Sequence, residues 1–388
     1  MKIFVLLSRI PYPLEKGDKL RAFNQIKFLS KNHEIILCAL NDSKVNKQDA
    51  FQSLQPYCRS VTFIDLPKIN RALSICKAYF TSKPLQIGYF YNRKAHKKIS
   101  AIIKEHKPDH LYCQLVRTAE YIKNQNIPKT IDYQDVFSKG VERRIKSSPF
   151  YLKPFLKLEY KRLLKYENYI FDKFDNKTII SIPDRNLIPH PEKEKIAIIL
   201  NGVDTDYFKP MKREKEYDLV FTGNMGYPPN VNSVIFLTEK ILPIVRKKMP
   251  DIKVMFAGAS PDQKVKAVKS KNIKVTGWVD DIRECYAKAK IFIAPMQIGT
   301  GLQNKLLEAM AMKIPCISSP LANNALKAKD GEEIIIGDSP EKYAEKIIYF
   351  LENYNEAEKI AENGFSFVHK NYNWENATMK LEKLMFGD

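Results

Sequence analysis

Short apolar runs alternate with amphipathic segments through the first half of the chain, and this alternation predicts its secondary structure. Mostly apolar runs that are typical of buried strands occur at 2–7, 34–39, 61–64, 110–113, 129–133 and 177–181. Between the first two runs, Ala22, Ile26 and Leu29 have helical spacing, which predicts a helix at 20–30, and a longer helix is expected at 155–173. Strands that alternate with helices favour a parallel sheet, whose ligands lie beyond the carboxyl ends of the strands.

The same alternation begins again after a boundary near residues 199–210. Further strands are expected at 218–222, 253–257, 273–276, 291–294 and 314–318, and further helices at 232–248, 283–288 and 303–312. A chain of 388 residues with 44% hydrophobic content can bury two cores. We therefore predict an α/β protein with two domains, 1–203 and 204–370. The remainder, 371–388, is predicted to be a helix that packs back on the first domain.

The strand–helix–strand unit at 291–318 carries the most distinctive polar residues. Its strand ends at Pro295, and a loop with Gly299 and Gly301 leads into the helix. Backbone N–H groups at a helix N-terminus attract anions, and glycines let a ligand approach closely. Lys305 in the first turn suits a phosphate, and Glu308, one turn later on the same side, suits ribose hydroxyls. The combination indicates a nucleotide, although a tight turn followed by a surface Lys–Glu pair would give the same pattern.

The positive charge is concentrated in the first half of the chain. Residues 1–200 contain 37 Lys and Arg against 19 Asp and Glu, whereas residues 201–388 contain 27 against 25. Nucleic acid, an anionic membrane surface or an anionic substrate would each be attracted to such a half. The chain contains no RNP-like, helix-turn-helix or zinc motif, so no nucleic-acid partner is expected.

Basic and aromatic residues are interleaved between residues 139 and 165, which leaves three interpretations open. The stretch is a solvated helix face, a patch that contacts anionic lipid headgroups or, without any motif to support it, a nucleic-acid contact. The six cysteines are scattered without a Cys-x-x-Cys pair, and no run of eighteen apolar residues occurs. We therefore expect a cytoplasmic protein, with the basic half as a candidate for peripheral attachment to the inner face of the plasma membrane.

Three motifs resemble the retaining GT-B glycosyltransferases of family 4. They are Asn201-Gly-Val-Asp204 followed by Phe208-x-Pro210, Thr276-Gly-x-Val-x-Asp-Ile, and Gly299-x-Gly…Lys305-x-x-Glu-Ala-Met-Ala. The segment Arg9-Ile-Pro-Tyr-Pro also resembles a bacterial subgroup of sugar transferases linked to exopolysaccharide gene clusters. The resemblance implies two Rossmann-like domains facing across a cleft, with a nucleotide-sugar donor held mainly by the second. It also implies sugar transfer, with retention, to a glycan or lipid-linked acceptor in cell-surface polysaccharide synthesis.

The resemblance further implies a set of donor-binding residues. Glu308 matches the last carboxylate of the family's Glu-x7-Glu motif and would bind the ribose, while the first carboxylate is replaced by Thr300. Lys305 would meet the diphosphate. The backbone of the first-domain loop at Gly17 would also contact the diphosphate. The backbone of the glycine loop would do the same at Gly299, Thr300, Gly301 and Leu302. Gly223 and Asn224 stand where the family has Gly-Arg, and Gly277 and Val279 would contact the base.

The family's first-domain His is absent, and the corresponding segment reads Ile131-Asp-Tyr-Gln-Asp135. Asp132 and Asp135 are thus candidate catalytic carboxylates that would accept a proton from an attacking hydroxyl, with Gln134 also on the acceptor side. Capping or loop aspartates are the alternative interpretation.

Neither a metal nor a cofactor is expected, because the donor is itself the substrate and Asp204-Thr-Asp206 lies at the domain hinge. Two rival functions remain. One is a nucleotide-sugar epimerase with the same fold. The other is a non-catalytic, membrane-associated binding protein with a degenerate site.

Overall fold

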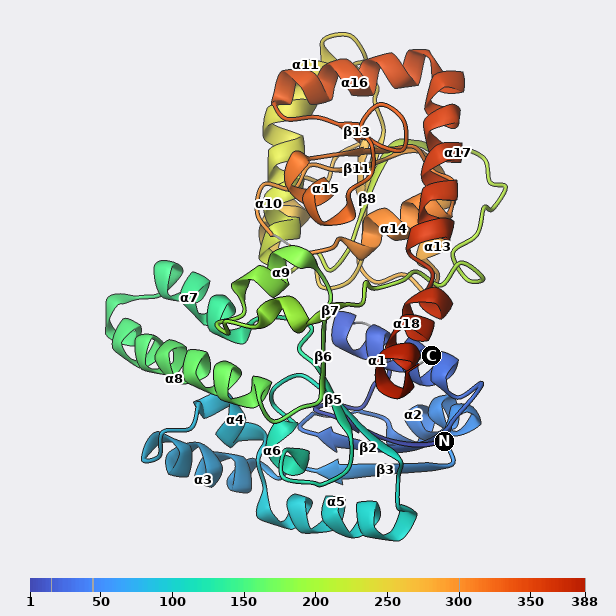
Figure 1. Cartoon of the computed structure of the whole chain (residues 1–388). Helices are drawn as coiled ribbons and strands as arrows, with labels where there is room; N and C mark the ends of the chain where they lie inside the picture. Colours follow the sequence, from blue (N-terminus) through green and yellow to red (C-terminus); the bar gives the residue numbers. More distant parts are fainter. Residues whose placement is uncertain (15, 44, 300, 388) are drawn as a thin grey trace. The chain divides into compact units, whose positions relative to one another are not determined.

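The computed structural model describes residues 1–14, 16–43, 45–299 and 301–387, and of residues 70, 76 and 147 the backbone alone. The chain divides into two compact units. Unit 1 consists of Met1–Leu200 together with Trp374–Asp388, and unit 2 consists of Asn201–Asn373. Figure 1 shows both units, coloured along the chain.

Unit 1 contains a parallel sheet with the strand order β3-β2-β1-β4-β5-β6-β7 in the described residues. The strands are β1 (Lys2–Leu7), β2 (Glu34–Asn41), β3 (Ser60–Asp65), β4 (His110–Gln114), β5 (Lys129–Asp132), β6 (Asn176–Ile179) and β7 (Ala197–Ile198). Alternate residues of β1 enter opposite cores, because side chains of a strand alternate between faces. Phe4 and Leu6 belong to one core, and Ile3, Val5 and Leu7 belong to the other.

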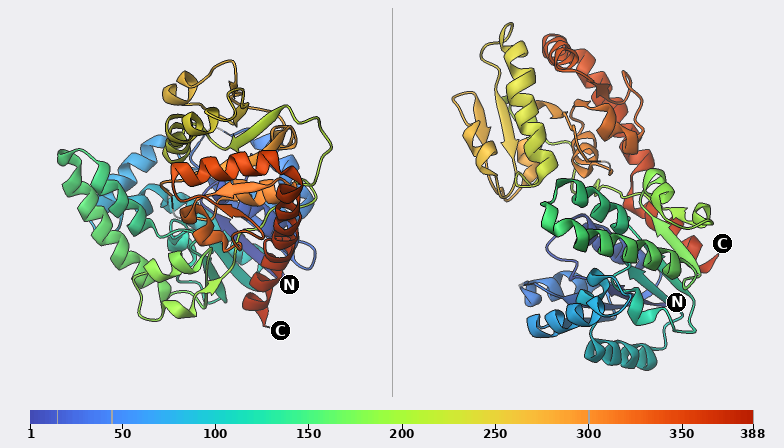
Figure 2. Two further views of the ribbon diagram at one scale, coloured as in Figure 1. Left: turned by 90° about the horizontal axis from the view of Figure 1, so that it is seen from above. Right: turned by 90° about the vertical axis from the view of Figure 1, so that its left-hand side faces the viewer.

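Helices cover both faces of this sheet. They are α1 (Gly17–Leu29), α2 (Lys47–Leu54), α3 (Lys68–Tyr79), α4 (Leu85–Phe90), α5 (Arg93–His106), α6 (Ala119–Ile122), α7 (Phe137–Ser147), α8 (Lys153–Phe171) and α9 (Ile182–Leu187). Helices α7 and α8 project from the sheet as a pair in both Figures 1 and 2. None of the helices in the described ranges is both long and apolar enough to cross a bilayer.

The last helix, α18 (Trp374–Phe386), returns to unit 1 and lies beside α1 (Figure 1). Leu381 and Met385 pack into the same core as Ile26 of α1. An ion pair of 2.5 Å between Lys31 and Glu375 and a 2.9 Å contact between His33 and Glu382 add to this packing. The chain therefore passes into unit 2 and returns to unit 1, so that two backbone connections link the units.

Unit 2 repeats the architecture with the strand order β10-β9-β8-β11-β12-β13 in the described residues. Its strands are β8 (Tyr217–Thr222), β9 (Val254–Ala257), β10 (Ile273–Val275), β11 (Ala289–Ala294), β12 (Cys316–Ser318) and β13 (Ile335–Ile336). Its helices are α10 (Pro228–Phe236), α11 (Leu242–Arg246), α12 (Gln263–Ala267), α13 (Ile282–Ala287), α14 (Asn304–Ala311), α15 (Pro320–Leu326), α16 (Pro340–Glu352) and α17 (Tyr354–Asn371). The prediction of two parallel α/β units of Rossmann type is confirmed.

The helix expected at 232–248 has other limits and is not uniform. Helix α10 begins at Pro228, four residues earlier, because prolines fit the first turn, where no N–H donor is needed. A π-helical segment at Leu237–Ile241 then separates α10 from α11. The helix ends at Arg246, two residues before the predicted end.

Both sheets reverse their strand order between the first and the fourth strand. In unit 1 this switch point lies between β1 and β4, and in unit 2 it lies between β8 and β11. Loops that leave neighbouring parallel strands in opposite directions open a crevice at the carboxyl ends of those strands, where such folds bind ligands. The candidate residues are therefore considered at these two places.

Candidate functional site

Two glycines bring the loops of unit 2 into close contact at its switch point. Gly223, directly after β8, has a φ of +143°, and a Cβ atom there would lie 2.7 Å from Nδ2 of Asn230. Gly258, directly after β9, has a φ of +141°, and its Cβ would lie 1.8 Å from the carbonyl oxygen of Gly223. Both positions require glycine, because the backbone conformation and the available space exclude a side chain.

Lys305 extends from the first turn of α14 to the end of β8. Its ammonium group hydrogen-bonds Oδ1 of Asn230 and lies 4.6 Å from the centre of the Phe221 ring. The same ammonium would lie 3.4 Å from a Cβ at Gly223. Burial lowers the pKa of Lys305 to about 7. An anionic ligand beside this lysine would raise its pKa again, because a nearby negative charge favours the protonated ammonium that burial disfavours.

Glu308 lies one turn further along α14 and is held by Tyr286 of α13. The fully buried Tyr286 hydroxyl donates a 2.8 Å hydrogen bond to Oε2 of Glu308 and lies 2.7 Å from Oγ1 of Thr222. Burial raises the pKa of Glu308, while the Tyr286 hydrogen bond and the nearby Lys305 oppose that rise. Lys305 and Glu308 thus lie on one side of α14, as their spacing predicts, and side chains from α10 and α13 fix both of them.

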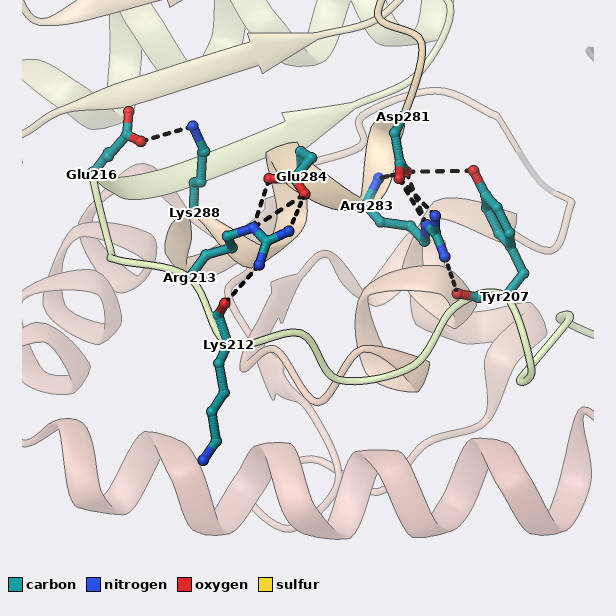
Figure 3. Close-up of polar contacts among 8 residues, drawn as sticks. All are labelled: Tyr207, Lys212, Arg213, Glu216, Asp281, Arg283, Glu284 and Lys288. Atoms are coloured by element: carbon teal, nitrogen blue, oxygen red, sulfur yellow. Dashed lines mark hydrogen bonds and ion pairs between the residues drawn. The ribbon is translucent and has the colours of Figure 1, made fainter.

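The loop that follows β10 is anchored through Asp281. Its carboxylate caps α13 by accepting a 2.9 Å hydrogen bond from the Arg283 backbone, and it pairs at 2.7 Å with the Arg283 guanidinium. That guanidinium lies 4.0 Å from the centre of the Tyr207 ring, and the Tyr207 hydroxyl donates to Asp281 at 3.4 Å (Figure 3). Gly277, with a φ of +74°, begins the loop. The loop is thus fixed at its far end.

The segment 204–216 packs along α13. Arg213 pairs with Glu284 at 2.7 Å and Lys288 pairs with Glu216 at 2.8 Å (Figure 3). The ring of Phe208 packs edge-on against Tyr286 with 6.4 Å between centroids. The Asn-Gly-Val-Asp…Phe-x-Pro motif therefore supports the residue that holds Glu308.

Asp204 serves as a local turn residue. Its carboxylate accepts hydrogen bonds from the backbone N–H groups of Asp206 and Tyr207 at 3.1 and 3.0 Å. Nowhere in the described residues do three or more His, Cys, Asp or Glu side chains group in a way that could hold a metal ion.

Most of the predicted donor residues lie at one edge of the unit 2 sheet. Those that follow β8, β10 or β11, or belong to α14, are Gly223, Asn224, Gly277, Val279, Gly299, Gly301, Leu302, Lys305 and Glu308. Asn224 forms a turn, accepting at its side chain from the Gly226 N–H and at its carbonyl from Nδ2 of Asn230. Thr300 lies outside the described residues. Gly17 begins α1 and therefore belongs to the switch point of unit 1.

Asp132, predicted as a catalytic carboxylate, is enclosed in the core of unit 1. Its oxygens accept from Nε and Nη2 of Arg21 at 2.6 and 3.2 Å and from Oγ1 of Thr178 at 2.9 Å. Both Asp132 and Arg21 are 0% exposed, and Arg21 also donates to the carbonyl of Ile199 at 2.9 Å. These surroundings do not favour proton transfer to Asp132. Asp132 instead has a structural role. Its pair with Arg21 connects α1 to β5, and Arg21 also connects α1 to Ile199, near the end of the first segment of unit 1.

Asp135 is exposed and follows a strained turn. Gln134 has a φ of +59°, and Leu115, at the end of the neighbouring β4, has a φ of +65°. Such conformations in residues other than glycine cost free energy and are concentrated at functional sites. Oδ1 of Asp135 accepts from the Val136 N–H at 2.8 Å. The structure thus places Asp135 at the ligand-binding edge of the sheet, and its catalytic role stays a prediction.

A group of charged residues that sequence reasoning missed surrounds the unit 1 switch point. Arg9, after β1, pairs with Asp18 at 3.1 Å, and both line a small cavity that reaches Leu115 after β4. Arg117 stacks 4.5 Å from the centre of the Phe137 ring and donates to Gln86 at 3.0 Å. Burial lowers the pKa of Arg117 to about 10, so the guanidinium stays cationic at neutral pH.

Comparisons with known proteins bear on the fold and on the reaction class. Residues 216–353 match the sequence model of a family described as glycosyl transferases group 1. A protein of Klebsiella pneumoniae, described as an uncharacterized 44.6 kDa protein in the cps region, is 25% identical over 400 residues, which cover 96% of each chain.

Solved structures of similar fold cover almost the whole chain. A glycosyltransferase from Rickettsia africae superposes with a TM-score of 0.70 and 16% identity, covering 99% of this chain and 97% of the other. HepE from Anabaena in complex with UDP superposes with a TM-score of 0.69 and 12% identity, covering 99% of each chain. Sucrose-phosphate synthase from Thermosynechococcus elongatus superposes with a TM-score of 0.68 and 13% identity, covering 99% of this chain and 98% of the other.

The chain therefore has the GT-B fold, and residues 216–353 match the sequence model of group 1 glycosyl transferases. The predicted resemblance is confirmed at this level. Membership of family 4 and retention of anomeric configuration stay predictions.

Proposed function

We propose that this protein transfers a sugar from a nucleotide-sugar donor to a glycan or lipid-linked acceptor in the synthesis of a cell-surface polysaccharide. The observation that carries the proposal is the placement of Lys305 and Glu308 on one side of α14 at the β8–β11 switch point, where Asn230 and Tyr286 hold them. The group 1 glycosyltransferase domain supports the reaction class. The Klebsiella relative from a cps region supports the link to polysaccharide.

The donor is proposed to lie along the carboxyl edge of the unit 2 sheet. Glu308 accepts hydrogen bonds from ribose hydroxyls, and Lys305 faces the diphosphate together with backbone N–H groups of the glycine loop. The base lies against the loop of Gly277 and Val279. The complex of HepE with UDP supports a nucleotide of this class as the ligand.

Lys305 contributes to catalysis through charge. Transfer breaks the bond between the anomeric carbon and the β-phosphate oxygen, and the electron pair leaves with the nucleoside diphosphate. An ammonium group and helix N–H groups directed at that oxygen stabilise the developing charge, with roughly 1.5–3 kcal/mol for each charge-assisted hydrogen bond. The acceptor hydroxyl forms the new bond to the same carbon, with retention of configuration, and gives up its proton to a base or to the departing phosphate.

The acceptor is proposed to bind at the unit 1 switch point. Arg9, Arg117 and Asp135 all follow strands of that sheet at its carboxyl edge. Two guanidinium groups suit an acceptor that carries phosphate, since arginine binds phosphate oxygens in a bidentate manner. A lipid-linked sugar phosphate has this chemistry. Asp135 remains the candidate base because it is the exposed carboxylate of the 131–135 segment.

The decisive experiment is donor hydrolysis across a panel of UDP-, GDP- and dTDP-sugars. We expect slow release of the nucleoside diphosphate from one donor, and we expect Glu308→Ala to abolish both release and binding of that nucleotide in calorimetry. Glu284→Ala is the matched control, because this partly exposed carboxylate pairs with Arg213. Conversion of the donor sugar without release of nucleotide would indicate an epimerase instead. Absence of binding to every nucleotide would favour the non-catalytic alternative.

A further inference from the structure

Large apolar side chains are unusually exposed in two segments of unit 1. On and just after α3, Ile69, Leu73 and Phe80 are 75%, 64% and 86% exposed. At the turn into α8, Phe150, Tyr151 and Phe155 are 83%, 60% and 55% exposed. Single exposed apolar residues are ordinary on protein surfaces, but a group of large ones marks an interaction site. These six residues are called the apolar face below.

The two segments are joined by hydrogen bonds between α8 and the α3–α4 turn. Arg162 of α8 donates to the carbonyl oxygens of Ala78 and Tyr79 at 3.0 and 2.9 Å. Glu159 of α8 accepts from the N–H groups of Leu85 and Gln86 at the start of α4. Helices α3, α4 and α8 accordingly lie together at one side of unit 1 in Figures 1 and 2.

Phe155 lies on the side of α8 that faces the start of α4. Phe155 precedes Glu159 by four residues, so its side chain lies on the same side of α8, one turn closer to Phe150. Glu159 itself is 6% exposed because α4 covers it, whereas Phe155 extends beyond that cover. The first turns of α8 therefore expose apolar side chains on the side of that helix that faces α4, which follows α3 in the chain.

The surroundings of the apolar face are almost purely basic. Residues 66–84 contain four Lys and Arg and no Asp or Glu, and residues 137–165 contain nine Lys and Arg and two Glu. Of those two carboxylates, Glu159 is buried against α4, and Glu142 pairs with Lys139 at 2.9 Å. Lys68 and Lys77 are exposed on α3, and Lys77 follows Leu73 by four residues, so it lies beside the apolar residues of that helix. A partner of opposite charge must therefore be anionic and also able to receive apolar side chains.

We infer that the apolar face docks on an anionic lipid bilayer. Aromatic and aliphatic side chains enter the boundary between headgroups and acyl chains, while flanking lysines meet anionic headgroups. A protein partner fits less well, because lysine is depleted at protein interfaces. Single-stranded nucleic acid fits less well too, because the aliphatic Ile69 and Leu73 offer no ring on which a base could stack. The inference is independent of the proposed sugar transfer, since it uses other residues.

The test is sedimentation of the full chain with vesicles of phosphatidylcholine alone or mixed with phosphatidylglycerol. We expect binding to the mixed vesicles that weakens as salt is added. The double variant Phe80→Ser/Phe150→Ser should bind roughly tenfold or more weakly, because two apolar side chains no longer leave water. Lys68→Gln/Lys77→Gln should lose about fivefold for each lysine removed.

Matched controls come from unit 2. Tyr349→Ser removes a side chain that is 48% exposed on α16, and Lys342→Gln/Lys359→Gln removes two exposed lysines. These controls should bind vesicles as the unchanged protein does, and all variants should keep their circular dichroism spectrum. Equal binding to neutral and anionic vesicles would overturn the inference, as would losses of the same size in the controls. Self-association in sedimentation velocity that Phe150→Ser abolishes would also overturn it, by making the face an interface between two copies.

Discussion

The buried hydroxyl of Tyr286 donates a 2.8 Å hydrogen bond to Oε2 of Glu308, across 22 residues of sequence. The tyrosine ring is itself supported by Phe208, and its hydroxyl contacts Thr222 at the end of β8. Glu308 is therefore held in place before any ligand arrives. A carboxylate fixed in this way binds a ligand hydroxyl at lower entropic cost than a mobile one.

Removal of this hydroxyl should weaken nucleotide binding. In Tyr286→Phe the carboxylate of Glu308 loses a charged hydrogen bond that positions it, and we expect about a tenfold loss of affinity for the nucleoside diphosphate. Calorimetry measures this directly. The control is Tyr354→Phe, whose hydroxyl makes only a 3.5 Å contact with the carbonyl of Lys290. Equal affinity in the two variants would mean that Tyr286 does not position Glu308.

Loss of the Lys305 ammonium should affect binding of the diphosphate. Lys305→Met keeps the length of the apolar stem and removes the charge, so we expect affinity to fall by a factor of about ten to a hundred, equivalent to roughly 1.5–3 kcal/mol. The lysine Lys290, which pairs with Asp218 at 2.9 Å, provides the control Lys290→Met. An affinity for the nucleoside that falls as much as that for the diphosphate would contradict a specific contact with phosphate.

The pH dependence of diphosphate binding should report on Lys305. Its pKa is lowered to about 7, so the free protein loses the ammonium proton as the pH rises above that value. Binding that requires the protonated form should then weaken by up to about tenfold per pH unit above pH 7. Ionisation of the terminal phosphate, with a pKa of about 6, acts in the opposite direction. In Lys305→Arg the decline should disappear, because a guanidinium stays charged. A decline that persists in this variant would assign the titration to another group.

Two glycine substitutions should differ sharply in their effect on stability. Gly258→Ala places a Cβ 1.8 Å from the carbonyl oxygen of Gly223 at a φ of +141°, so we expect unit 2 to lose about 3 kcal/mol or more of unfolding free energy. At Gly17, an added Cβ meets nothing within 4 Å among the described residues. Gly17→Ala should therefore change the free energy of unfolding by less than about 1 kcal/mol. Urea unfolding measures both, and similar losses would contradict the close approach of the two loops.

Asp132 should behave as a structural residue. Asp132→Asn removes the carboxylate that pairs with the buried guanidinium of Arg21, and we expect unit 1 to lose about 3–5 kcal/mol of unfolding free energy. Asp135→Asn, at an exposed position, is the comparison and should leave stability within about 0.5 kcal/mol. Unfolding in urea and turnover of the donor are measured on both variants. Normal stability of Asp132→Asn together with lost turnover would restore the catalytic interpretation.

The local pattern of apolar and polar residues was sufficient to predict many of the strands and helices. The apolar runs of β1, β2, β8 and β11 and the spacing of Ala22, Ile26 and Leu29 reflect burial that depends on near neighbours in the chain. The limits of α10 were less predictable: the helix was expected from residue 232, whereas Pro228 begins it four residues earlier. The short strands β7 and β13, of two residues each, carry too little pattern to be recognised.

By itself, the sequence determined that a glycine loop precedes α14 and that Lys305 and Glu308 share one side of that helix, because both follow from helical periodicity over a few residues. Only the tertiary structure decided which side chains hold them. Asn230 lies 75 residues from Lys305, and Arg21 lies 111 residues from the Asp132 that it buries. These pairs meet because the strand order places β8 beside β11 and folds α1 over β5. A periodicity measured along the chain carries no information about that order.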